Sequence, residues 1–467
     1  MKSEITSKNG ILKETLIYSI GSFGSKIFSF LLIPFYTFFL TKKEIGDFDL
    51  LFTSITLFVP LVSLQMSDAV YRWLIEDHET DKRKTIIISN GFFGLIIAFT
   101  IFLLFFVFYT WKYPFRYSLY FIILLFLNSL LPILQNILRG LGDTKKFAFN
   151  GVITSILLVI FNIIFIYVLK LKLDGILLAN IIAFSIAIIL IYFQLRLYKY
   201  IKLSFFDRLV LIDFCKYTLP LIPNLMSWWL ISSASKFIIL HYLGTEANGI
   251  YAITSRFPSI LIIINSVLIL PIQDSFLKKD SKNSELNFII KHFIKLEFSL
   301  ILMLIVTAPF YMRIIVSKEF YESWPYMPFL YLGVGFNTLG ALFGLIYQKN
   351  KATKQITVST MIGASISIIF SILFVRQYQL MAISVAFLLG YIIMTMIRFI
   401  DLKKYFNDSR ILIELLMFLS LCMIAFFISY YSTNVVRLFI ILISGIISIY
   451  LNMNFIRILL KKININI

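Results

Sequence analysis

The sequence predicts an all-α membrane protein with about fourteen transmembrane helices. Apolar runs of roughly 20 residues, each long enough to cross a bilayer as a helix, fill the chain, and the polar breaks between them are short. The composition agrees, since 60% of the 467 residues are hydrophobic and 14% are charged; a soluble domain carries about 25% charged residues. Two distant cysteines, Cys215 and Cys422, offer neither a disulfide framework nor a metal-ligand spacing.

The apolar runs define the expected helices in chain order. The first run follows a polar N-terminus and has no small-residue cleavage site, so we expect it to remain as the first span. Glycine and proline inside the runs are tolerated, because neighbouring helices satisfy freed backbone groups. The expected spans are 13–40, 46–74, 85–109, 117–139, 147–169, 175–195, 217–243, 249–276, 289–314, 326–348, 355–375, 380–400, 411–431 and 437–460.

Basic residues predict the orientation of these spans. One set of ends and loops (the N-terminus, 72–84, 139–146, 196–216, 278–291, 349–354, 398–410 and the C-terminus) holds 29 of the 43 Lys and Arg residues, and the opposite set holds 10. The positive-inside rule places the richer set in the cytoplasm. We therefore expect both termini in the cytoplasm. The same rule explains the net charge of +19 without a nucleic-acid partner.

The two halves of the chain resemble each other. Residues 40–48 align with 243–251 at an offset of 203, and 139–145 align with 348–354 at an offset of 209. We expect two pseudo-symmetric six-helix lobes around a central cavity, with two appended helices. The predicted parts are an N-terminal lobe at 1–200, a C-terminal lobe at 201–405 and the appended spans at 406–467. Rocking of one bundle against the other would give alternating access.

Three basic residues inside spans are the candidates for substrate contact. Lys26 lies in span 1, with Ser22 and Ser29 on the same helix face, and Lys236 and Arg256 lie in spans 7 and 8. Charge at bilayer depth usually faces a cavity or a partner. The last two lie ten residues from the turn between their spans, so we expect both about 10–15 Å below the outer surface. No acid lies in the middle of spans 1, 7 or 8, which favours a positive cavity suited to phosphate.

Other roles remain open for these and for weaker candidates. Lys26 could snorkel, and Arg256 could pair with Asp47 or Asp49. Trp229 could stack on sugar rings or simply pack. A bend in span 7, and a gating role for it, is predicted from Pro220, Pro223 and Asn224. The remaining polar candidates for the cavity are Asp47, Asp68, Arg72, Arg139 and Asp274.

Short motifs carry a resemblance to a known family. They are Tyr18-Ser19-Ile20-Gly21, Pro34-Phe35-Tyr36-Thr37, Leu40, Glu44, Gly46, Asp49-Leu50, Arg72, and Leu138-Arg139-Gly140-Leu141-Gly142-Asp143-Thr144-Lys145. With the span number and loop pattern, these resemble the bacterial polysaccharide-biosynthesis flippases, which include the O-antigen flippases. Their superfamily also holds multidrug-and-toxin extruders and the peptidoglycan lipid II flippase.

The resemblance implies a flippase for an undecaprenyl-diphosphate-linked oligosaccharide, with a basic V-shaped cavity between two lobes. It implies membrane lipids and other polysaccharide assembly proteins as partners. We expect no cofactor, no metal and no direct ATP hydrolysis, since no ATP-binding motif is present. A cation-coupled drug or metabolite exporter of the same fold is the first alternative, although that branch commonly relies on buried acids and span 1 has none. A membrane glycan polymerase or ligase is the second, but the longest outer segment, 316–325, is short for such chemistry.

Overall fold

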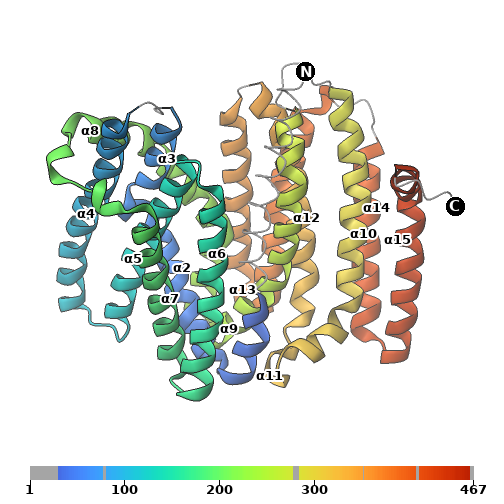
Figure 1. Ribbon diagram of the computed structural model, residues 1–467. Helices are drawn as coiled ribbons and strands as arrows, with labels where there is room; N and C mark the ends of the chain where they lie inside the picture. The colour runs from blue at the N-terminus through green and yellow to red at the C-terminus, as the bar shows by residue number, and fades with distance from the viewer. Residues whose placement is uncertain (1–29, 77–79, 277–282, 351, 406–409, 463–467) are drawn as a thin grey trace. The chain divides into compact units, whose positions relative to one another are not determined.

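The chain forms helices joined by short turns and loops in the residues that the computed structural model describes, which are 30–76, 80–276, 283–350, 352–405 and 410–462 (Figure 1). The all-α prediction is confirmed. The helices are α2 (Lys42–Ser63), α3 (Met66–Glu76), α4 (Asp81–Lys112), α5 (Ser118–Gly140), α6 (Thr144–Asn162), η1 (Ile163–Val168), α7 (Lys172–Leu195), η2 (Leu197–Lys199), η3 (Leu203–Phe205), α8 (Arg208–Thr218), α9 (Leu221–Phe276), α10 (Asn283–Ile315), α11 (Lys318–Tyr321), η4 (Trp324–Tyr326), α12 (Met327–Lys349), α13 (Thr353–Asp401), η5 (Lys403–Tyr405), α14 (Arg410–Tyr431) and α15 (Asn434–Lys462).

Eleven helical segments in the described residues are long and apolar enough to cross a membrane. Two of them are long enough to contain two spans each. α9 has 56 residues and α13 has 49, and straight helices of these lengths would measure about 84 and 74 Å against a hydrocarbon core of about 30 Å. Each is interrupted at one residue with non-helical dihedrals, Gly244 in α9 and Gln379 in α13. With the short apolar helix Phe30–Phe39, these segments account for the predicted fourteen spans.

Both double helices fold back at their interruptions. In α13, a Cβ atom added to Gly363 would press on the carbonyl oxygen of Gly390, and one on Gly390 would press on that of Gly363. These residues could not meet if α13 were straight. In α9, Ile239 and Tyr251 join one buried apolar cluster from opposite sides of Gly244. Each double helix is therefore a hairpin of two spans.

Three features differ from the expected spans. Span 2 is broken, because Leu64 and Gln65 adopt positive φ angles of 46° and 50° between α2 and α3. The expected loop 196–216 contains most of α8, an amphipathic helix whose N-cap, Asp207, accepts a hydrogen bond from the amide of Leu209 at 2.8 Å. Span 7 is interrupted at 219–220, between α8 and α9, since Pro220 cannot continue the hydrogen-bonding pattern of a helix.

The first of two compact units runs from Met1 to Ser233. In its described part, α3, α4, α5, α7 and α8 share one apolar core, in which Met66, Ile87, Leu134 and Phe214 are almost completely buried. The helix α8 packs on α3 and α4, which lie beside it in Figure 1. Its Phe214 ring centroid lies 5.0 Å from that of Trp73 on α3. The basic stretch after span 6 therefore forms part of the folded unit.

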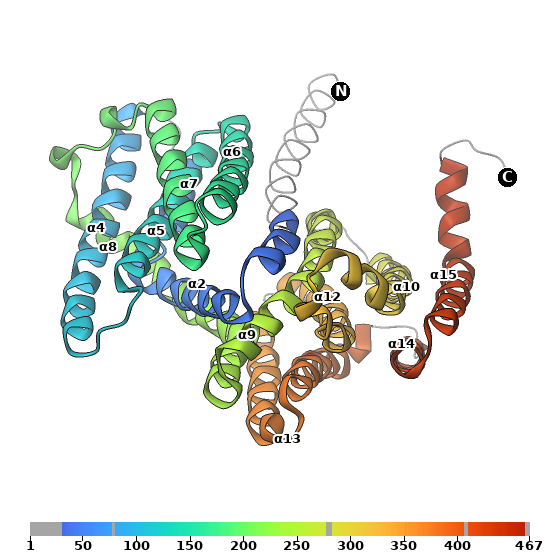
Figure 2. The ribbon, with the colours of Figure 1, turned by 90° about the horizontal axis from the view of Figure 1, so that it is seen from below.

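The second unit runs from Ala234 to Ile467 and is organised around α12. Figures 1 and 2 both show α10 between α12 and α15. Phe298 on α10 contacts Phe336 on α12 and Phe418 on α14, with ring centroids 5.5 and 5.9 Å apart. The two appended spans thus pack on α10. The lobe limits predicted at 200 and 405 stay predictions, since the division into units follows contacts and falls inside α9.

The internal repeat is visible in the hydrogen bonds of two turns. After α5, the amide of Leu141 donates to Ile137 O at 2.9 Å, and that of Asp143 donates to Leu138 O at 2.9 Å. After α12, Asn350 donates to Ile346 O at 3.1 Å and Ala352 to Tyr347 O at 2.8 Å. Every donor and acceptor of the second turn lies 209 residues after its counterpart, which is the offset read from the sequence.

Candidate functional site

Two of the three predicted cavity cations lie on α9, on either side of Gly244. The side chains of Lys236 and Arg256 are half-buried. Gly244 has φ 84° and ψ −179°, a combination that is open almost exclusively to glycine. Lys236 precedes this turn by eight residues and Arg256 follows it by twelve, which places them about 12 and 18 Å from it along their helices. The expectation of equal depth was therefore wrong by about one helical turn, because the chain reverses two residues before Glu246.

The serines near these cations bond mainly to the helix backbone. Ser255 donates to Ala252 O at 3.1 Å, and Ser259 donates to Arg256 O at 2.5 Å. Ser232 lies 3.1 Å from the hydroxyl of Ser233. Such bonds satisfy the serine protons locally.

Several predicted site residues lie outside the described part of the structure. Lys26, Ser22 and Ser29 fall in residues 1–29. Asn224 and Asp274 belong to α9, but their side chains are also outside the described set. The roles predicted for these five residues remain predictions.

The polar candidates Asp68 and Arg139 meet within the first unit. Arg139, at the end of α5, lies over the ring of Tyr71 on α3, with 4.4 Å from its Cζ to the ring centroid. Its guanidinium donates to Tyr71 Oη and to Asn136 Oδ1, both at 3.3 Å. It also acts electrostatically on the half-buried carboxylate of Asp68, in the first turn of α3. These contacts tie α3 to α5.

The other candidates also make contacts inside their own unit. Arg72 is exposed and lies over the Tyr217 ring of α8 at 4.9 Å. Trp229 donates from Nε1 to the backbone oxygen of Thr53 at 3.0 Å, which joins the start of α9 to α2. Asp47 is half-buried near the start of α2. Pro223 lies one turn after the interruption at Pro220.

Sequence reasoning missed a buried acid in the second unit. Glu297 on α10 is 1% exposed, and its Oε1 accepts a hydrogen bond from Asn265 Nδ2 of α9 at 2.7 Å. The same amide donates to Thr338 Oγ1 of α12 at 2.9 Å. Among the residues that the structure describes, Glu297 Oε2 and Asn265 Oδ1 have no hydrogen-bond partner although both are buried. Lys295 pairs instead with Glu414 of α14 at 3.8 Å; two residues apart on a helix, Lys295 and Glu297 face nearly opposite sides.

A buried arginine was also missed. Arg398, which we had counted in a cytoplasmic loop, lies in the last turn of α13 and is 3% exposed. It donates to Gly340 O and Thr360 Oγ1 at 2.7 Å, to Ser359 Oγ at 2.9 Å and to Ile356 O at 3.2 Å. The guanidinium therefore lies inside the second unit and donates hydrogen bonds to both α12 and the start of α13. In the described residues, no group of acids, histidines and cysteines forms a metal site.

Known proteins with the same fold are membrane transporters. The chain is similar in structure to the lipid II flippase MurJ in an inward closed conformation (18% identity, 96% of this chain and 99% of that chain, TM-score 0.66). It is also similar to a multidrug resistance MATE family transporter of the MOP superfamily in an inward-facing conformation (14% identity, 83% of this chain and 95% of that chain, TM-score 0.67). A MOP superfamily transporter from Pyrococcus furiosus is similar as well (15% identity, 86% of this chain and 96% of that chain, TM-score 0.54).

At these identities the similarity shows the fold alone, which this chain shares with these transporters. Curated protein sequences give no match. The sequence profile of one family, described as polysaccharide biosynthesis protein, matches residues 11–277, which is more than half of the chain. This multi-pass membrane protein therefore belongs to the polysaccharide biosynthesis protein family.

Proposed function

We propose that this protein is a flippase that moves an undecaprenyl-diphosphate-linked oligosaccharide, such as an O-antigen or capsule unit, from the inner to the outer leaflet of the bacterial cytoplasmic membrane. The family membership supports polysaccharide biosynthesis as the process. The similarity to a lipid II flippase supports a lipid-linked substrate. Other polysaccharide assembly proteins are further partners in this proposal.

One observation carries the proposal most directly. Lys236 and Arg256, both half-buried, flank the same hairpin turn inside spans 7 and 8. Lysine and arginine are the side chains that proteins use for phosphate, and placing them at membrane depth is costly unless they face water, a ligand or a protein partner. A diphosphate linked to a glycan supplies such an anion, while its polyprenyl tail remains in the lipid.

The mechanism follows from this arrangement. The two cations, together with Lys26 of span 1, bind the diphosphate. Rocking of one lobe against the other then exposes it to the other side. The turn at Gly244 holds the helices of Lys236 and Arg256 together, so both cations move with the same hairpin. No bond of the substrate is made or broken, so the activity is transport. The basic ends of the spans support a cytoplasmic location for both termini under the positive-inside rule.

Surface glycan in living cells tests this function. In a strain that lacks the chromosomal copy, glycan export should fall when Lys26, Lys236 or Arg256 is replaced singly by alanine. Lys318→Ala, which removes an exposed cation near the turn between α10 and α12, is the matched control and should export normally. Normal export by all three cavity variants at normal protein levels would contradict the site. Unchanged surface glycan after deletion of the gene would contradict the function itself.

A cation-coupled exporter is the second candidate, and the buried Glu297 favours it. A carboxyl group that is 1% exposed, with one oxygen lacking a donor, is a natural place for a transported proton or sodium ion. Deletion would then alter drug sensitivity and leave surface glycan unchanged. A polymerase or ligase is less well supported, because the family and the structural relatives are transporters. The outer segment 316–325 contains only the short helix α11 and the start of η4.

A further inference from the structure

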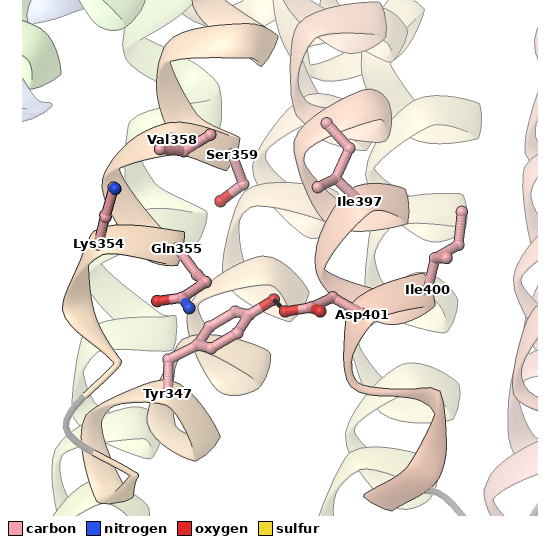
Figure 3. A pocket seen from close by; sticks show the side chains of 8 residues that line it. All are labelled: Tyr347, Lys354, Gln355, Val358, Ser359, Ile397, Ile400 and Asp401. Carbon is pink, nitrogen blue, oxygen red and sulfur yellow. Dashed lines mark hydrogen bonds between the residues drawn. The ribbon is translucent and has the colours of Figure 1, made fainter.

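A pocket opens in the second unit where α12 ends and α13 begins and ends (Figure 3). Its volume is about 550 Å³. The lining residues are Tyr347, Lys354, Gln355, Val358, Ser359, Ile397, Ile400 and Asp401. Because all of them lie within one or two turns of a helix end, the pocket is at the level of the membrane surface. The pocket is far from the turn at Gly244, because that turn lies at the opposite end of the membrane spans. The pocket is therefore separate from the proposed diphosphate site.

The polar end of the pocket carries one cation and one anion. Asp401 accepts a hydrogen bond on Oδ2 from the hydroxyl of Tyr347 at 2.7 Å, which fixes the carboxylate and leaves Oδ1 for another donor. Lys354 is exposed at the other side of the pocket, as Figure 3 shows, and makes no ion pair in the described part of the chain. Behind Ser359 lies the buried guanidinium of Arg398, 2.9 Å from the serine oxygen. Positive potential therefore gathers near Lys354 and Ser359, and negative potential near Asp401.

The other end of the pocket is apolar and open to the outside of the unit. Val358 lies one turn deeper in the membrane than Lys354, and Ile397 lies one turn deeper than Asp401, about 6 Å in each case. Val358 is 45% exposed and Ile400 is 70% exposed. Exposed apolar side chains then continue along the same half of α13: Met361, Ile362, Ile369, Ile372 and Leu373. A ligand with a charged head and a hydrocarbon tail matches this sequence of surfaces.

We propose that the pocket binds one phospholipid whose headgroup carries both a phosphate and a primary ammonium, as in phosphatidylethanolamine. Ser359, which is 1% exposed and donates its proton to Ile356 O at 3.0 Å, forms the floor of the pocket. The phosphate lies by Lys354, the ammonium donates to Asp401, and an acyl chain follows Val358 along α13. Phosphatidylcholine has no N–H to donate to Asp401. An anionic lipid without an amine, or a polyprenyl diphosphate, would place negative charge against the same carboxylate. The expected role is a structural lipid of the leaflet on this side, which goes beyond the transport proposal.

Competition between two lipids with identical acyl chains tests the proposal on the purified full-length protein. Native mass spectrometry would count bound phosphatidylethanolamine and phosphatidylcholine at equal concentration. We expect a preference of about threefold for phosphatidylethanolamine, which is the size of a charge-assisted contact near the surface. Asp401→Asn should bring the ratio close to one. Lys354→Gln should weaken the binding of both lipids and leave their ratio unchanged. Val358→Trp, which places a bulky side chain in the apolar end of the pocket, should also weaken the binding of both.

Lys403→Gln is the matched control, because it removes an exposed charge two residues after Asp401 that does not line the pocket. It should change neither the amount of bound lipid nor the ratio. Equal binding of both lipids by the unaltered protein would overturn the proposal, and so would a preference that survives Asp401→Asn. Efficient competition by soluble phosphoethanolamine or by a polyprenyl diphosphate would overturn it too. Glycan export is not measured here, so a failure would leave the flippase proposal untouched.

Discussion

Asn265 Nδ2 on α9 donates to Glu297 Oε1 on α10 at 2.7 Å, inside a region where both side chains are at most 2% exposed. The amide also reaches Thr338 on α12, so one asparagine joins three helices around a carboxyl group. The second carboxyl oxygen has no donor. A buried carboxyl group in this state is costly.

Glu297→Gln should raise the stability of the protein. Glutamine keeps the oxygen that accepts from Asn265 and removes the charge, so we expect the free energy of unfolding to rise by about 1 kcal/mol. Thermal unfolding of the purified protein in detergent would measure the change. Glu246→Gln, the same substitution at an exposed position beside the α9 turn, should have an effect within about 0.5 kcal/mol. A clear loss of stability in Glu297→Gln would contradict the account.

The sequence predicted the spans and the interruption of span 7 at Pro220, but not the break in span 2. Apolar runs identify membrane helices because the bilayer requires about 20 such residues for each crossing, and Gly244 marks its turn through a conformation that glycine alone tolerates. The break at Leu64 and Gln65 has no such signal, since both residues are ordinary helix formers. Tertiary contacts override the local preference there.

The site was predictable only in part. Lys236 and Arg256 were found because charges stand out in apolar runs, and the structure keeps both half-buried. Arg398 was missed because it lies in the last turn of α13, where charge normally faces water. Glu297 lies well inside α10, and the sequence does not show that its side chain is buried between helices. Which side of a helix faces a neighbour depends on the packing of three helices at once. For Glu297, the sequence indicated only that its side chain faces nearly the opposite side of the helix from Lys295, because the two residues are two positions apart.

Arg398→Lys should destabilise the second unit although it preserves the charge. Arginine satisfies oxygens on α12 and α13 through three of its nitrogens, and the single ammonium of lysine cannot reach them all. We expect a loss of about 2–4 kcal/mol, from buried acceptors left without donors, measured as a lower midpoint of thermal unfolding. The matched control is Arg376→Lys, at an exposed position of α13, which should change stability by less than about 0.5 kcal/mol. Equal effects of the two substitutions would contradict the role of Arg398.

Gly363→Ala should loosen the hairpin of spans 11 and 12. Its new methyl group would press on the carbonyl oxygen of Gly390, which is backbone and cannot move aside. The expected cost is about 1–3 kcal/mol, seen in thermal unfolding. Gly445→Ala in α15 is the control, because a Cβ there meets no atom within 4 Å. That change should leave stability unchanged or raise it by up to about 1 kcal/mol through helix propensity. A neutral Gly363→Ala would show that the two helix backbones are not in close contact.

Gln379→Gly should stabilise the protein, which is unusual for a substitution to glycine. Gln379 has φ 49° and ψ −131° at the turn between the two halves of α13, a conformation that strains a residue with a side chain by about 1–3 kcal/mol. Glycine relieves that strain at an entropic cost of about 0.5–1 kcal/mol. The expected result is a higher unfolding midpoint for Gln379→Gly and a lower one for Gln377→Gly, an exposed position two residues earlier with helical geometry. Because the two substitutions have the same effect on the unfolded chain, opposite signs would isolate the strain of Gln379 in the folded state. If both lower the midpoint equally, Gln379 is unstrained, and the second hairpin turn differs physically from the glycine turn at Gly244.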